Sequence, residues 1–138
     1  MNITSPQSSV SVPKPIQDWH TYAKSRDVSA LADLLDEHCT FQSPVVFTPQ
    51  QGRAITTKYL AAALQVLGNE SFAYKREWHA ADSAVLEFES SVEGVLVNGV
   101  DIITWNAANK ITDFKVMVRP LKGVNKLHEV MGRMLARG

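Results

Sequence analysis

The fold is decided by the stretch GVDIITWNAANKITDFKVMVRPL, residues 99–121. It contains two runs in which apolar and polar residues alternate, and the turn-forming residues 106–109 separate them. Such alternation predicts strands with one buried face, and the short turn predicts that the two strands form an antiparallel hairpin. In the first strand Asp101 shares a face with Ile103 and Trp105. Because that pair is the larger apolar set, we expect Asp101 to point into the core.

Two more alternating runs precede this hairpin, FAYKREWHA at residues 72–80 and AVLEFESSV at residues 84–92. Four strands joined by short connections must be antiparallel neighbours, because a parallel return needs a crossover of about a dozen residues. The chain therefore predicts a curved antiparallel sheet. The turn between the second and third strands lies at residues 93–94, which we favour, with Gly99 as a bulge, or at residues 98–99.

The acidic residues indicate which face of the sheet meets the helices. In the 84–92 run, Phe88 lies on the face opposite Glu87 and Glu89, so we expect the Phe88 face to be covered and the acidic face to be solvated. The same reasoning gives the inward residues of the last strand as Phe114, Val116 and Val118.

Helical spacing appears on the N-terminal side of the predicted sheet. One apolar stripe predicts a helix from Pro15 to near Ser25, and Asp27 then N-caps a second short helix whose stripe ends at Leu35. CTFQSPV, residues 39–45, predicts a brief strand that runs into a loop.

Two further helices complete the predicted order of elements. One runs from Arg53 to Leu67, and we expect Gly68 to end it in the left-handed conformation. The other follows Pro120 and carries an apolar stripe at Val124, Leu127, Met131 and Leu135. Helices followed by a run of antiparallel strands predict an α+β fold.

Composition limits the classes of function. Among 138 residues, 14 Lys and Arg balance 14 Asp and Glu, which argues against a nucleic-acid footprint or an anionic membrane surface. We expect a flexible leader at residues 1–14 and a single domain at residues 15–138. A lone cysteine, Cys39, and the lack of a signal or membrane-spanning run predict a soluble cytoplasmic protein. No cluster has metal-ligand spacing, so we expect no metal and no cofactor.

Asp101 has two interpretations. A carboxyl group among Trp, Ile and Phe side chains loses hydration, which raises its pKa and makes it a hydrogen-bond donor or an acid. The alternative is a structural role near the end of the strand, in which Asp101 accepts hydrogen bonds from backbone N–H groups or from Arg53.

RDVSALADLLDEHCTFQSPV at residues 26–45 is followed by QGRAITTKYL at residues 51–60, and the last strand of the opening stretch ends in Arg-Pro. These motifs and the order of the predicted elements resemble the nuclear transport factor 2-like superfamily. The resemblance covers residues 16–122 and looks closest to the SnoaL-like branch, which includes polyketide cyclases and is related to ketosteroid isomerase. It implies a cone-shaped α+β barrel, in which a curved antiparallel sheet wraps around a long helix and encloses an apolar pocket, with additional N-terminal and C-terminal helices.

The resemblance also implies roles for three positions. Asp101 matches the aspartic acid that the isomerase keeps protonated in apolar surroundings, where it donates a hydrogen bond to the substrate oxyanion. Ser43 stands where the isomerase has its catalytic base. Trp19 stands in place of a second oxyanion donor, a tyrosine, and its indole N–H donates but does not exchange a proton near neutral pH. Steroid isomerisation by the familiar route is therefore not expected.

Two other reactions of related proteins are compared with these residues. The SnoaL-type cyclases use a pocket aspartate as general acid and base, and Asp101 fits that role. Epoxide hydrolysis in a related family needs two carboxylates and an arginine, for which Asp101, Arg53 and Asp113 are the candidates. Asp113 has the outward parity, which argues against that reaction.

We therefore predict a protein that binds a small apolar ligand, carbonyl-bearing or aromatic, with Asp101 as the acid of an isomerisation, cyclisation or dehydration. The predicted pocket is lined by Trp19, Tyr22, Phe41, Ser43, Tyr59, Phe88, Ile103, Trp105, Phe114 and Val116. The alternative is a non-catalytic dimeric binding or protein-interaction module, which the missing base at Ser43 favours. The resemblance implies a homodimer through the outer sheet face, near Glu87, Glu89, Lys115 and Met117.

Histidines are considered separately, because histidine readily moves protons near neutral pH. His20 lies about 100° from the apolar stripe of the first helix, and we expect it and His38 to be exposed. In the 72–80 run the larger ring, Trp78, is expected to point inward and His79 outward.

Overall fold

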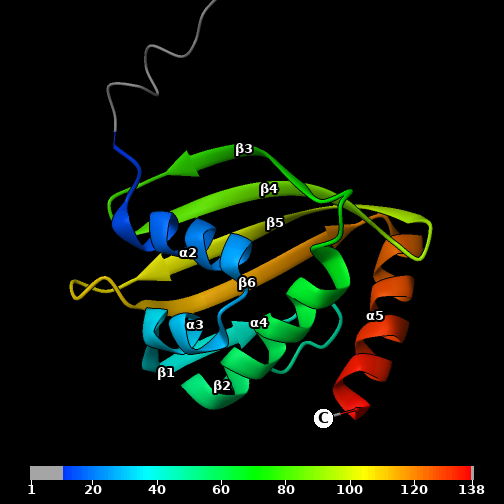
Figure 1. Ribbon diagram of the computed structural model, residues 1–138, viewed down its shortest axis with the longest axis horizontal. Helices are drawn as coiled ribbons and strands as arrows, with labels where there is room; N and C mark the ends of the chain where they lie inside the picture. The colour runs from blue at the N-terminus through cyan, green and yellow to red at the C-terminus, as the bar shows by residue number, and fades with distance from the viewer. Residues whose placement is uncertain (1–10, 138) are drawn as a thin grey trace, which may run out of the picture.

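A curved six-stranded sheet with helices on its concave face forms the protein, which has the predicted α+β class (Figure 1). The computed structural model describes residues 11–137, so most of the predicted leader at residues 1–14 lies outside the described residues. In spatial order the strands are β2 (Gln50–Gln51), β1 (Leu35–Gln42), β6 (Ile111–Arg119), β5 (Val95–Trp105), β4 (Ser83–Val92) and β3 (Ala73–His79). The sheet stays open, with β2 and β3 as its edges, so it is not a closed barrel.

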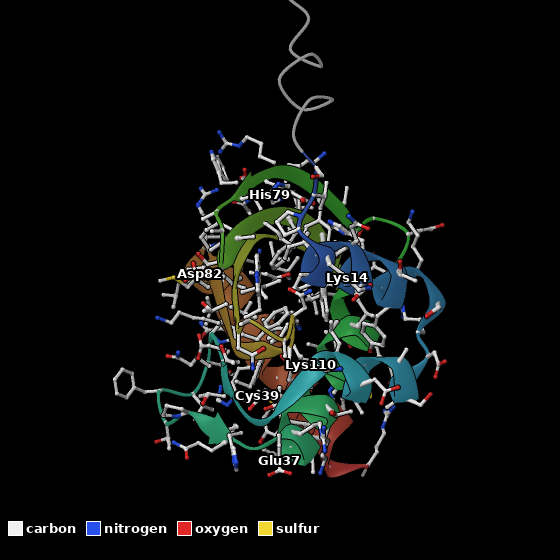
Figure 2. All side chains as sticks on the ribbon, turned by 90° about the vertical axis from the view of Figure 1, so that its left-hand side faces the viewer. Lys14, Glu37, Cys39, His79, Asp82 and Lys110 are labelled. Atoms are coloured by element: carbon white, nitrogen blue, oxygen red, sulfur yellow. The ribbon has the colours of Figure 1, made fainter. Side chains whose placement is uncertain are left out.

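Figure 2 looks along the strands and shows the sheet as an arch with the helices on its concave side. The inward alternation of the long strands produces this core, because Phe88 of β4 and Phe114 of β6 are both almost fully buried. Burial of each phenyl ring contributes roughly 1.5–3 kcal/mol. The inward parities predicted for β4, β5 and β6 are confirmed.

The turn between β4 and β5 lies at Glu93 and Gly94, as predicted, and both residues have positive φ angles, 48° and 84°. The predicted bulge at Gly99 is wrong. Gly99 pairs in regular register with Phe88 on one side and Val118 on the other. A Cβ atom there would lie 2.6 Å from Cζ of Phe88, so the glycine admits the phenyl ring.

A bulge in β3, between Tyr74 and Arg76, is one of three places where the register of the described sheet shifts. The bulge shifts the alternation of inward and outward side chains by one residue. Tyr74, before the bulge, and Glu77, after it, therefore both face the concave side of the sheet. Trp78 therefore points outward, is 50% exposed and stacks with the Arg76 guanidinium 5.0 Å from its ring. The expectation that Trp78 points inward is wrong, because simple alternation along β3 does not hold.

β1 extends the sheet by parallel pairing with β6, which places Phe41 beside Phe114. The strand begins at Leu35 and ends at Gln42, so the prediction of a strand at residues 39–45 was displaced. Leu35 belongs to this strand and not to the preceding helix, α3 (Val28–Leu34). The predicted N-cap is confirmed, because the Asp27 carboxylate accepts a hydrogen bond from the Ser29 N–H at 3.1 Å.

The remaining helices are α2 (Lys14–Ser25), α4 (Arg53–Leu67) and α5 (Leu121–Ala136). Gly68 ends α4, but its φ is −82°, so the predicted left-handed conformation is wrong. A Cβ atom at this position would lie 2.5 Å from the Leu64 carbonyl oxygen, and this close approach explains the glycine. Among residues 11–137, no helix is both long and apolar enough to span a membrane.

Candidate functional site

A cavity of about 190 Å³ lies between the concave face of the sheet and the helices α2, α4 and α5. Most of its wall is apolar, and the walls come from elements far apart in the sequence. Figure 1 shows α2 and α5 at opposite ends of the sheet, with α4 between them. The side chains that line it include Trp19, Phe41, Ser43, Tyr59, Leu60, Leu64, Phe72, Tyr74, Phe88, Asp101, Phe114, Val116, Leu127, His128, Met131, Gly132 and Leu135.

Asp101 is the acidic group in this apolar wall. It lies in the middle of β5, between Leu86 and Val116 on the neighbouring strands, and is 6% exposed. The Tyr74 hydroxyl donates a hydrogen bond to Oδ2 of Asp101 at 2.6 Å. Trp19 in turn donates its indole N–H to the Tyr74 oxygen at 2.8 Å. The partner of Asp101 is therefore Tyr74, and the alternative of a strand-end carboxylate bound to Arg53 is wrong.

Burial raises the pKa of Asp101 to about 7. The hydrogen bond from Tyr74 and the nearby charge of His20 both lower the pKa, but desolvation outweighs them. Burial and the neighbouring Asp101 carboxylate raise the pKa of Tyr74 well above its usual value, so Tyr74 stays a neutral phenol. The site therefore exchanges a proton at Asp101 near neutral pH while Tyr74 keeps its own.

Ser43 lies in the cavity wall, at the position where the resemblance implies a base. Its oxygen accepts a hydrogen bond from the Val45 N–H at 3.0 Å, which fixes the side chain against its own loop. Asp113 lies on the outer face, where Gln42 donates a hydrogen bond to it at 3.0 Å. Arg53 is exposed and does not line the cavity. The arrangement needed for epoxide hydrolysis is therefore not formed.

Seven of the ten side chains predicted to line the pocket lie in the cavity wall. The other three, Tyr22, Ile103 and Trp105, are buried outside it. Tyr22 packs behind Trp19, with 5.4 Å between the ring centroids. Ile103 and Trp105 have the predicted inward parity, but they lie further along β5 than the cavity extends. Alternation along a strand gives the face of a residue and not its distance from the cavity.

Sequence reasoning missed two parts of the site. Tyr74 was overlooked, although it shares a face with Phe72 in the alternating run, because its pairing with Asp101 depends on the sheet register. The second part is the wall from α5, which includes His128 and Gly132. The sequence predicts the apolar stripe of that helix. A helix that packs on a closed core and a helix that lines a cavity have the same stripe, so the pattern does not distinguish them.

Three ionisable side chains meet beside Tyr74, at the β3 edge that Figure 2 marks with His79. Glu77 lies 2.6 Å from Nε2 of His20 and 2.9 Å from Nε2 of His79. Burial alone would raise the pKa of Glu77, but the hydrogen bonds to both histidines outweigh it and hold that pKa below its usual value. His20 is half-buried, contrary to the expectation of exposure, because its contact with Glu77 holds it against β3.

His38 is exposed, as expected. Within the part of the chain that the structure describes, no group of three or more His, Cys, Asp or Glu side chains is arranged to hold a metal ion.

Comparison with known proteins places this geometry in a family. The profile of the SnoaL-like domain matches residues 16–114. The chain is 38% identical to a steroid delta-isomerase from Pseudomonas aeruginosa of known crystal structure, with a TM-score of 0.84, over 89% of this chain and 90% of that one. Among curated proteins the search finds no match.

Two further crystal structures share the fold. An uncharacterized protein with a cystatin-like fold from Silicibacter pomeroyi is 30% identical, with a TM-score of 0.84, over 91% of this chain and 87% of that one. An NTF2-like protein of unknown function from Mesorhizobium loti is 18% identical, with a TM-score of 0.67, over 78% of this chain and 89% of that one. The chain therefore belongs to the SnoaL-like domain family and has the nuclear transport factor 2-like, ketosteroid isomerase-like fold.

Proposed function

We propose that the protein binds a small apolar carbonyl compound in its cavity and that Asp101 donates a hydrogen bond or a proton to the carbonyl oxygen. One observation carries the proposal. Among residues 11–137, Asp101 supplies the one carboxyl group of the cavity wall, and it is held there by the Tyr74 hydroxyl at 2.6 Å. A ligand that fills an apolar cavity and ends in a carbonyl oxygen matches this pattern of one polar position in an apolar wall.

Protonation of Asp101 decides whether this side chain can donate a hydrogen bond to a ligand. When Asp101 is ionised, it accepts the hydrogen bond from the Tyr74 hydroxyl, and neither group donates to a ligand. When Asp101 is protonated, its own O–H can donate to a carbonyl oxygen on which negative charge develops. Trp19 donates to the Tyr74 oxygen in both states, so it holds the phenol in place. A preorganised donor of this kind stabilises an enolate-like transition state, which isomerisation, cyclisation and dehydration of carbonyl compounds share.

The cavity volume limits the size of the ligand. An engineered apolar cavity of about 150 Å³ holds one benzene molecule. At about 190 Å³, this cavity has room for one substituted ring or a chain of similar bulk. The four fused rings of a steroid exceed that volume, so we propose a monocyclic or open-chain ligand.

Similarity to the Pseudomonas aeruginosa steroid delta-isomerase supports isomerase chemistry for this chain, at 38% identity. Ser43 carries a hydroxyl where that chemistry by its familiar route needs a carboxylate base. Asp101 therefore acts as the acid, or hydrogen-bond donor, of the proposed reaction. Steroid isomerisation by the familiar route is not proposed.

A pair of probes tests the hydrogen-bond donor. 4-Chlorophenol carries an oxygen on a single ring, and 4-chlorotoluene has the same shape without that oxygen. We expect wild-type protein to bind the phenol more tightly than the toluene by about tenfold, the value of one hydrogen bond of about 1.4 kcal/mol. Isothermal titration calorimetry at pH 6 measures both affinities.

Variants at Asp101 assign the effect. Asp101→Leu is expected to abolish the preference for the phenol, whereas Asp101→Asn keeps a donor at every pH. Asp101 is protonated at pH 6, below its pKa of about 7, so the acid can donate to the phenol oxygen in this measurement. A preference that persists in Asp101→Leu would contradict the proposal.

A second candidate function is non-catalytic binding of the same ligands, and the serine at position 43 favours it. Such a protein would bind 4-chlorophenol as above but would not speed any proton transfer. Proton exchange at carbon therefore separates the two functions.

A further inference from the structure

We infer that His128 of α5 accepts the proton that a carbonyl compound bound at Asp101 loses from the neighbouring carbon. The inference rests on the proposed function and extends it, because it supplies a base at a cavity where Ser43 does not provide one. It also narrows the ligand class to monocyclic or open-chain compounds with a C–H bond next to the carbonyl group.

The cavity wall contains few groups that exchange protons near neutral pH. The ionisable side chains that line it are Tyr59, Tyr74, Asp101 and His128. Tyrosine gives up its proton near pH 10, and the pKa of Tyr74 is raised well above that value. Two groups remain, and they come from different elements: Asp101 from β5 and His128 from α5. A ligand that fills the cavity contacts both walls.

The surroundings of His128 leave its imidazole available. Neighbouring charged residues of α5 are paired: Lys126 and Arg133 both contact Glu93 and Glu129. Within residues 11–137, His128 has no hydrogen-bond or ion-pair partner, so both ring nitrogens can meet a ligand. Histidine is the side chain best suited to accept a proton at neutral pH.

Gly132 lies one turn after His128 on the same face of α5 and lines the cavity with it. A glycine inside a helix is less favourable than an alanine at the same position. At Gly123 of the same helix, close packing explains the glycine, because a Cβ atom would lie 2.7 Å from Cγ1 of Val97. At Gly132 a Cβ atom would meet nothing within 4 Å. Protein packing does not require this glycine, and its exposed position leaves the part of the cavity wall beside His128 uncovered.

The proposed step balances without an oxidant or a reductant. The C–H bond next to the carbonyl breaks, and its proton goes to the neutral imidazole nitrogen of His128. The electron pair of that bond forms a carbon–carbon double bond, and the carbonyl π electrons move to the oxygen, where Asp101 donates a hydrogen bond. Return of the proton from the imidazolium to the same carbon restores the substrate. Return to another carbon of a conjugated enolate gives an isomer with a moved double bond.

Hydrogen–deuterium exchange of cyclohexanone in D₂O tests the step directly, with mass spectrometry as the measurement. Wild-type protein should exchange the hydrogens next to the carbonyl faster than buffer alone. His128→Gln removes the proton acceptor on the exposed helix surface and should lower the enzymatic rate by about 100-fold, the usual contribution of a general base. His38→Gln, at an exposed histidine away from the cavity wall, should leave the rate unchanged.

A second readout separates chemistry from structure. In His128→Gln the affinity for 4-chlorophenol should stay within about twofold of wild type, because the donor at Asp101 is intact. If His128→Gln exchanges at the wild-type rate while Asp101→Asn does not, Asp101 is its own base, and the inference fails while the proposed function stands. If the phenol binds and no exchange exceeds that in buffer, the inference also fails and the protein is a binder. If wild-type protein shows no preference for the phenol over 4-chlorotoluene, the proposed function itself fails.

Discussion

Asp101 combines a buried carboxyl group with a hydrogen bond from a neutral phenol, and these two features act on its pKa in opposite directions. Desolvation is the larger effect, because an ionised carboxylate loses far more hydration energy in an apolar cavity than one hydrogen bond returns. The side chain is therefore an acid with a pKa near neutral pH, and it makes the free energy of unfolding depend on pH.

Asp101→Asn is expected to change the pH dependence of the free energy of unfolding. In wild-type protein the folded state holds the Asp101 proton up to about pH 7, whereas the unfolded chain releases it near pH 3.8. The folded state thus binds more protons across this window. The contribution of Asp101 to the free energy of unfolding is therefore greatest below about pH 4 and falls as the pH rises to about 7. The loss due to this group is on the order of 4 kcal/mol. Urea unfolding at pH 5 and pH 8 captures the part of this loss that falls above pH 5, about 3 kcal/mol.

The asparagine variant keeps the shape and the oxygen that accepts the Tyr74 hydrogen bond, but it carries no titrating proton. The difference in stability between wild type and variant should therefore shift in favour of the variant as the pH rises from 5 to 8. Other titrating groups affect both proteins alike, so the comparison isolates Asp101. A difference that does not change with pH would show that the carboxyl group has an ordinary pKa.

At the scale of elements, β3 and α5 complete the site, and in each a local irregularity matters. The bulge in β3 lets Tyr74 and Glu77 both face the concave side, although they are three positions apart and would lie on opposite faces of a regular strand. In α5, two glycines have opposite surroundings: Gly123 packs closely against β5, and Gly132 borders the cavity. Glycine is thus required by close packing at position 123, whereas at position 132 a side chain would meet no neighbour.

Alanine at the two glycines of α5 is expected to have effects of opposite sign on the free energy of unfolding. Gly132→Ala should stabilise the protein by about 0.5–1 kcal/mol, because the new methyl group meets no neighbour and the unfolded chain loses freedom. Gly123→Ala should destabilise it by about 1–3 kcal/mol, because its Cβ would overlap Val97. Thermal unfolding followed by circular dichroism measures both. Destabilisation by Gly132→Ala would mean that the space beside His128 is filled.

At the scale of the whole molecule, the convex face of the sheet carries exposed apolar side chains. Trp78 of β3 and Met117 of β6 are 50% and 54% exposed, and the Arg76–Glu87 ion pair lies on the same face. Exposed apolar groups framed by charges suit a contact with a second copy of the chain. Dimerisation through this outer face stays a prediction.

Met117→Lys is expected to weaken the dimer by about tenfold or more, because a charge would be buried in the contact. Val28→Lys, at an exposed apolar residue of α3, serves as the matched control and should leave association unchanged. Sedimentation velocity at increasing protein concentration measures both variants beside wild type. A wild-type protein that remains monomeric throughout the series would contradict the prediction.

Much of the fold followed from local patterns. The alternation in β4, β5 and β6 gave the strands, their antiparallel order and the inward direction of Asp101, and the helical stripes gave α2, α4 and α5. These predictions succeed because burial of an apolar face dictates a period of two or of 3.6 residues, which can be read without knowing the neighbours. The glycines at positions 68 and 99 were assigned to backbone conformation, whereas both admit a close neighbour. That distinction requires knowledge of which atoms approach.

From sequence alone it follows that an aspartic acid points toward an apolar core and that position 43 carries no carboxylate, whereas its raised pKa was one of two interpretations. Tertiary structure alone decided what surrounds that aspartic acid. Tyr74 reaches it through the register of β3 on β4 and of β4 on β5, and His128 borders the same cavity because α5 packs back across the concave face. Whether a residue faces the core depends mainly on its own polarity, which the sequence shows. The meeting of side chains 27 residues apart depends on how whole strands and helices align.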